Sequence, residues 1–87
     1  SILSKPIIDN TPIGSYLLNM LSIDILKIRT QVIWCLSNIA GDDRKYRNII
    51  VEKGGFDKVL YILDRNIDYE KRDIEFLKVC VWFISNI

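Results

Sequence analysis

Apolar residues recur along this chain at the spacing of helices. Two stretches carry them at intervals of three and four residues: Ile13, Tyr16, Leu17 and Met20 in the first, and Phe56, Val59, Leu60 and Leu63 in the second. Residues three and four apart share one face of a helix. The pattern therefore predicts two helices of medium length.

Each medium helix is preceded by a predicted short helix and followed by a predicted long helix. Asp24 is a suitable N-cap for the first long helix and Gly41 a suitable end for it, while Gly54 ends the second short helix. We therefore expect six helices in two units of three. They are about Lys5–Asp9, Pro12–Leu21 and Asp24–Ala40, followed by about Asp43–Lys53, Phe56–Asp64 and Tyr69–Ile87.

One phrase of the sequence occurs twice. I-W-C-L-S-N-I at residues 33–39 returns 48 residues later as V-W-F-I-S-N-I at residues 81–87, and these phrases hold the only two tryptophans. A unit of about 40–48 residues with three helices is typical of armadillo repeats. The sequence thus predicts an all-α protein of two armadillo repeats, residues 1–41 and 42–87, with five extra residues within about 64–70.

The composition suits a piece of a longer repeat array. Of the 87 residues, 49% are hydrophobic, which is high for a free domain of this size. Because a repeat buries its faces against its neighbours, we expect a fragment. We also expect its last helix to be cut short at the C-terminus, and its first helix is a candidate for truncation. The net charge of +1 gives no support for a nucleic-acid partner. No apolar run approaches the ~18–20 residues of a membrane helix.

Residues suited to catalysis and metal binding are sparse. The chain has no histidine, which removes the commonest general base and metal ligand. Ser37 and Ser85 have no partner base and are interpreted as small packing residues. Cys35 and Cys80 lie within apolar helix patterns. We interpret them as buried, reduced thiols of a cytosolic or nuclear protein. We therefore expect neither an enzyme nor a bound cofactor or metal.

Trp and Asn stand four residues apart in both copies of the phrase, so an indole and a carboxamide share one helix face. A carboxamide can pair with both backbone groups of an extended peptide. Two neighbouring indole faces can hold the stem of Lys or Arg, with a cation–π contribution of ~0.5–2 kcal/mol. The candidate peptide-binding residues are Gln31, Trp34, Asn38, Asp42, Trp82 and Asn86.

Two plainer interpretations stay open for these residues. A single Trp on an amphipathic helix belongs to the core more often than to a binding surface. Asp42 follows Asn38 by one turn and can supply an acid for an ammonium group. The pair Asp42-Asp43 could instead cap the next helix, because acids favour helix N-termini.

The residues Trp34–Asp42, W-C-L-S-N-I-A-G-D, resemble importin alpha, the family of nuclear-import adaptors built of armadillo repeats. Family members carry W-x-x-x-N on the last helix of most repeats and N-I-A-G-D in the third. Residues 51–56 resemble the family's turn into the middle helix. The resemblance covers nearly the whole chain and implies the third and fourth repeats of a right-handed superhelix.

The resemblance also implies a function, in the cytoplasm and nucleus. Importin alpha binds the lysine-rich nuclear localisation signals of cargo proteins in a concave groove. Asp42 would bind the key lysine, and Gln31 would contact the peptide, whereas Val79 stands where the family often has asparagine. Importin beta would bind through a region absent from this chain. The alternative is a structural armadillo or HEAT-like scaffold that docks a folded partner.

Overall fold

In the computed structural model, residues 11–65 and 73–87 are described, with side chains from residue 15 onward. These residues contain helices and no strand, so the predicted all-α class is confirmed for them. The armadillo superhelix stays a prediction. The helix expected over Lys5–Asp9 and most of the insertion at 64–70 lie outside the described residues. The helices are α2 (Thr11–Met20), α3 (Leu26–Asp42), α4 (Arg44–Glu52), α5 (Gly55–Arg65) and α6 (Ile74–Asn86).

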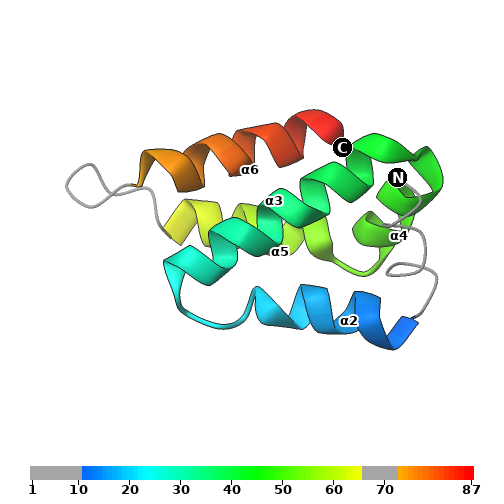
Figure 1. The fold of residues 1–87 in the computed structure, drawn as a ribbon, viewed down its shortest axis with the longest axis horizontal. Helices are drawn as coiled ribbons and strands as arrows, with labels where there is room; N and C mark the ends of the chain where they lie inside the picture. Colours follow the sequence, from blue (N-terminus) through cyan, green and yellow to red (C-terminus); the bar gives the residue numbers. More distant parts are fainter. Residues whose placement is uncertain (1–10, 66–72) are drawn as a thin grey trace.

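Helix α3 runs through the middle of the molecule (Figure 1). It packs against α2, α4 and α6, and α5 packs against α4 and α6. Helices α3 and α6 lie side by side and run in the same direction. With 17 and 13 residues, they are the longest of the described helices, as predicted. The two copies of the Trp–Asn phrase therefore lie on neighbouring parallel helices.

The core fixes which face of each long helix turns outward. Ile33 and Leu36 of α3 are 0% exposed, and so is Phe83 of α6. They belong to one cluster that also contains Val59 of α5 and Phe76 of α6. Burying an apolar side chain of this size stabilises the fold by about 1.5–3 kcal/mol. Because Ile33 and Leu36 point inward, the residues between them in the helical period point away from the core.

The first long helix begins and ends later than predicted. Its N-cap is Ile25, whose backbone is extended, and no side chain caps it. Asp24 instead accepts a hydrogen bond from the Arg29 guanidinium at 3.0 Å. The helix also continues through Gly41 to Asp42. Gly41 does not have the positive φ of a glycine that ends a helix, so the predicted stop at this residue was wrong.

Asp43 separates α3 from α4. Its backbone is extended, with φ −154° and ψ 134°, so it ends one helix and begins the next. Its side chain accepts a hydrogen bond from the backbone N–H of Lys45 at 2.8 Å. Of the two neighbouring aspartates, Asp43 is therefore the N-cap, and Asp42 belongs to the last turn of α3.

Two helix boundaries in the second half of the chain fall at a glycine and an aspartate. Gly54 has a φ of 83° and stands between α4 and α5, as the sequence predicted. Helix α6 begins at Ile74, later than the predicted start at Tyr69. Asp73 is extended and its carboxylate accepts a hydrogen bond from the backbone N–H of Phe76 at 2.9 Å. An extended N-cap at Asp73 is incompatible with a helix that runs through it from Tyr69.

Candidate functional site

A hollow of about 300 Å³ lies where the C-terminal parts of α3 and α6 meet. The parallel packing of the two helices brings residues from distant parts of the sequence to this place. Four of the six candidate residues line it. The lining residues are Ser37, Asn38, Gly41 and Asp42 of α3, and Trp82 and Asn86 of α6.

Both indoles lie at the surface. Trp34 is 49% exposed and Trp82 is 39% exposed, while Ile33 and Phe83 beside them in the sequence are buried. The plainer interpretation, in which these tryptophans fill the core, is therefore wrong. Asn38 and Asp42 are also exposed. The structure thus presents an indole, a carboxamide and a carboxylate to solvent along one edge of the α3–α6 pair.

Asn86 differs from Asn38 because it is tied to the neighbouring helix. Its Nδ2 donates a hydrogen bond to the backbone carbonyl of Ser37 at 3.0 Å, and the residue is half-buried. Ser37 is fully buried, and its Oγ donates to the carbonyl of Ile33 at 2.9 Å. The predicted packing role of Ser37 agrees with this burial. The tie from Asn86 to Ser37 was not predicted.

The other two candidate residues lie apart from this hollow. Gln31 and Trp34 are exposed on α3, about two turns and one turn nearer its N-terminus than Asn38, and neither lines the hollow. The lining indole is that of Trp82. Val79, which stands where the importin alpha family often has asparagine, is 6% exposed and belongs to the core. It therefore offers no polar contact to a ligand.

Charged groups near the hollow have both signs. Asp42 lines it, whereas Glu75 is exposed in the first turn of α6, about two turns before Trp82, and does not line it. Lys78 is one turn before Trp82 and was not identified from the sequence. It lines a second, mainly apolar hollow of about 360 Å³ along α6, with Trp82 at the boundary between the two hollows. The remaining lining residues of that second hollow are Ile74, Leu77 and Val81.

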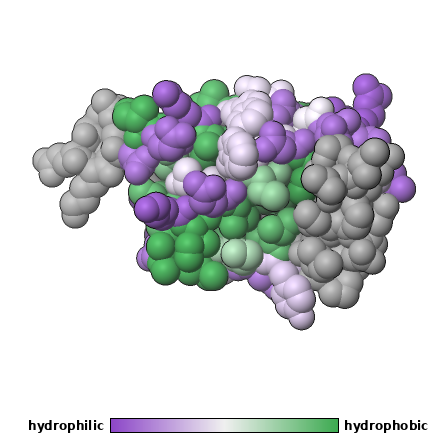
Figure 2. Space-filling model, in the orientation of Figure 1, coloured by the Kyte–Doolittle hydropathy of each residue, from purple (hydrophilic) through white to green (hydrophobic). Residues whose placement is uncertain are grey.

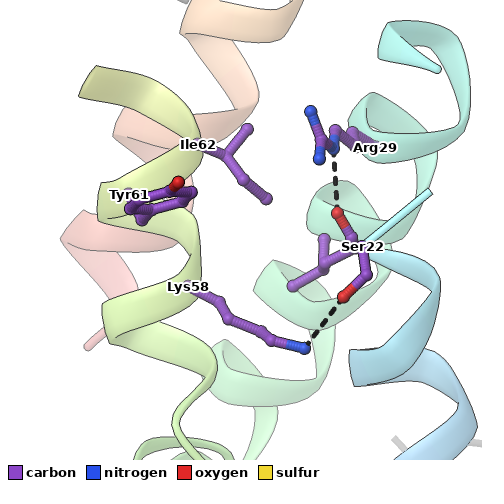
Figure 3. A pocket seen from close by; sticks show the side chains of 6 residues that line it. Ser22, Arg29, Lys58, Tyr61 and Ile62 are labelled. Carbon is purple, nitrogen blue, oxygen red and sulfur yellow. Dashed lines mark hydrogen bonds between the residues drawn. The ribbon is translucent and has the colours of Figure 1, made fainter. Parts of the chain in front are cut away.

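A third hollow, of about 260 Å³, lies between α5 and the turn after α2 (Figure 3). Two cations enter it. The Nε of Arg29 donates to the carbonyl of Leu21 at 2.8 Å, and the Nζ of Lys58 donates to the carbonyl of Leu18 at 3.4 Å and to the Oγ of Ser22 at 3.2 Å. Because the last carbonyls of a helix lack partners within it, these cations stabilise the C-terminal end of α2. The hydrogen bonds of Arg29 and Lys58 therefore have a structural role at this helix end.

The surface around that turn is apolar. Figure 2 shows hydrophobic side chains gathered at the lower left of the view, over the turn from α2 into α3. The exposed apolar residues of this segment are Met20, Ile23 and Ile25. This apolar surface lies away from the hollow that holds Asp42.

Features of other classes of site are missing from residues 11–65 and 73–87. No group of three or more His, Cys, Asp or Glu side chains in these ranges could hold a metal ion. Burial raises the pKa of both cysteine thiols, and that of Cys80 reaches about 12, so neither is an activated nucleophile. None of the described helices has the length and apolar character needed to cross a membrane.

Comparison with known proteins gives one partial similarity. The chain is 34% identical over 59 residues to importin subunit alpha-1b of Oryza sativa subsp. japonica. The matched residues are 68% of this chain and 10% of that protein, so the chain spans about a tenth of its relative's length. No protein-family model matches the chain, and no solved structure matches it. The similarity hints at an armadillo-type relation and suggests a role in protein interaction.

Proposed function

We propose that this chain is a non-enzymatic binding module for extended, lysine-rich peptides of the nuclear-localisation type, acting in the cytoplasm and nucleus. One observation carries the proposal. A single hollow combines a carboxylate, an indole and two carboxamides, from Asp42, Trp82, Asn38 and Asn86. These are the chemical groups that a lysine side chain and its own backbone require together.

The lysine side chain has two parts with different needs. Its methylene stem gains by covering an apolar ring, and the face of Trp82 offers one at the edge of the hollow. Its ammonium group needs an anion, which Asp42 supplies in the same hollow. A cation beside an indole also gains an electrostatic attraction of ~0.5–2 kcal/mol.

The peptide backbone is recognised by the carboxamides. The Asn38 side chain is exposed, so it can offer a donor and an acceptor to one peptide unit. Asn86 projects into the same hollow from the neighbouring helix. Two carboxamides on parallel helices suit an extended chain that crosses both helices. The partial similarity to an importin alpha subunit supports this proposal.

The test is a titration of the chain with a short lysine-rich peptide, followed by tryptophan fluorescence. The same peptide with its lysines replaced by alanine is the ligand control. Asp42→Asn should weaken binding roughly fivefold, because a largely exposed charge pair contributes up to about 1 kcal/mol. Salt should be held constant, since it screens such pairs.

Asp43→Asn is the matched control variant. It removes the same charge from the adjacent residue and keeps a side-chain acceptor for the N–H of Lys45, so α4 stays capped. Binding by this variant should stay within about twofold of wild type, since the substitution changes only the net charge near the hollow and none of its lining residues. Equal losses from the two substitutions would show that only general acidity matters and would remove the lysine site. No binding by the wild type would refute the proposed function.

The scaffold alternative keeps one specific observation in its favour. The apolar hollow along α6, lined by Ile74, Leu77 and Val81, suits the apolar face of a folded partner better than a basic peptide. Under this alternative, Leu77→Asp would abolish partner binding while Asp42→Asn would leave it unchanged. The peptide titration separates the two proposals.

A further inference from the structure

Gly41 and Asn86 touch across the interface of α3 and α6. A Cβ atom added to Gly41 would lie 3.0 Å from Nδ2, 3.3 Å from Cγ and 3.5 Å from Oδ1 of Asn86. The carboxamide therefore lies directly against the position that a Cβ at residue 41 would take. At 3.0 Å from the new carbon, the Asn86 carboxamide would have to shift by a few tenths of an ångström, away from its present hydrogen-bond geometry.

The Asn86 carboxamide has one chemically defined orientation. A backbone carbonyl can only accept a hydrogen bond, so the group that faces the Ser37 oxygen at 3.0 Å must be the NH₂ group. Ser37 is fully buried in the middle of α3, which keeps this acceptor in place. The carboxamide retains Oδ1 and one N–H for a ligand in the hollow.

The local backbone gives no reason for a glycine at residue 41. Gly41 is helical and lacks a positive φ, so alanine can adopt its conformation. In a helix, alanine is more stable than glycine by about 0.5–1 kcal/mol. The close approach of Asn86 is the feature that a side chain at this position would disturb.

We propose that Gly41 is a positioning residue of the groove. Its missing side chain lets the Ser37 carbonyl hold Asn86 so that Oδ1 accepts a hydrogen bond from a backbone N–H of the bound peptide. This inference rests on the proposed peptide-binding function.

The first test compares Gly41→Ala with wild type in the lysine-rich peptide titration. Binding should weaken about 3- to 10-fold, the range expected for one neutral hydrogen bond. Helicity and thermal stability should be unchanged or higher, which separates a positioning effect from unfolding. Equal binding by a wild type that does bind would overturn the positioning role. A wild type that binds no peptide would instead refute the proposed function.

Asn86→Ala provides the matched background. In that variant, adding Gly41→Ala should cause no further loss of binding, because the side chain that it displaces is gone. A further loss of the same size would show that Gly41 acts through another group and would overturn the proposal.

A second readout needs no peptide. The side-chain amide protons of Asn86, assigned by their disappearance in Asn86→Ala, can be followed by NMR. In the wild type, one of the two should show the small temperature dependence of a hydrogen-bonded proton. Gly41→Ala should remove that property. Unchanged Asn86 signals in Gly41→Ala would overturn the inference even where binding of the Asn86→Ala variant is too weak to measure.

Discussion

Two neighbouring aspartates at the end of α3 have different roles, and the difference lies in their backbones. Asp43 is extended and its carboxylate binds the N–H of Lys45, whereas Asp42 is helical and lines the hollow beside Trp82. The sequence showed two adjacent acids after a glycine and left open which of them caps the next helix. Backbone conformation at a single peptide unit decides this, and the residue types alone do not encode it.

Cys80 gives a prediction about pH. Its side chain is 0% exposed, and burial raises the pKa of its thiol from 9.0 to about 12. Between these values the unfolded chain loses the proton while the folded chain keeps it. The thiol's contribution to stability is therefore complete below pH 9 and is lost as the pH rises toward 12.

At pH 10.5, the loss from this one group should be about 2 kcal/mol of unfolding free energy relative to pH 8. Denaturant unfolding of wild type and Cys80→Ala at the two pH values measures it. The variant is less stable at both pH values because of the cavity, but it should show a smaller decrease between them. Parallel decreases in the two proteins would mean that the Cys80 thiol does not contribute.

At the scale of elements, Asp73 determines where α6 begins. Its carboxylate accepts the N–H of Phe76 at 2.9 Å, and α6 supplies Phe76, Cys80 and Phe83 to the core. Asp73→Ala should lower the unfolding free energy by about 0.5–2 kcal/mol. For a chain of this size, that is a melting temperature lower by about 4–8 °C per kcal/mol, measured by circular dichroism.

Asp73→Asn separates the hydrogen bond from the charge. Asparagine keeps an oxygen that can accept from Phe76 and is a comparable N-cap, so its loss should be clearly smaller than that of Asp73→Ala. If the two variants lose equal stability, the interaction of the carboxylate with the helix dipole is the larger effect, and the capping bond contributes little.

The elements with regular apolar spacing were predicted closely. The medium helices were expected at Pro12–Leu21 and Phe56–Asp64 and occur at Thr11–Met20 and Gly55–Arg65. The start of α3 was harder to predict. Aspartate is a common N-cap residue, but the carboxylate of Asp24 accepts a hydrogen bond from Arg29 instead. The Asp24 carboxylate could bind either the backbone N–H groups of the helix end or the Arg29 guanidinium. The folded geometry determines which of the two it binds.

The candidate site also has one part that the sequence predicts and one part that it does not. The outward face with Trp and Asn follows from a period of four and from the burial of Ile33 and Leu36. The hydrogen bond from Asn86 to the Ser37 carbonyl joins residues 49 positions apart. Periodicity within one helix carries no information about such a contact, because it depends on how closely two helices approach.

At the scale of the whole molecule, the two copies of the Trp–Asn phrase are similar in sequence but differ in how far their surroundings bury them. Ile33 is 0% exposed, and α6 packs against its helix, α3. Val81 is at the equivalent place in the repeated phrase, and it is 60% exposed; Ile74, nearer the start of α6, is 58% exposed. The face of α6 that corresponds to the covered face of α3 is open in this chain.

This open face predicts that the 87-residue chain associates with itself at high concentration, since exposed apolar surface drives association. Sedimentation velocity over a concentration series should show an increasing average mass for the wild type. Val81→Asp should shift the chain toward monomer, because it places a charge on the open face.

Val51→Asp, at a 41% exposed valine of α4, is the matched control and should behave as wild type. Both substitutions alter exposed positions, so folding stability should change by less than about 0.5 kcal/mol. A wild type that stays monomeric at all concentrations, or equal dissociation by the two variants, would show that association does not use the face of α6.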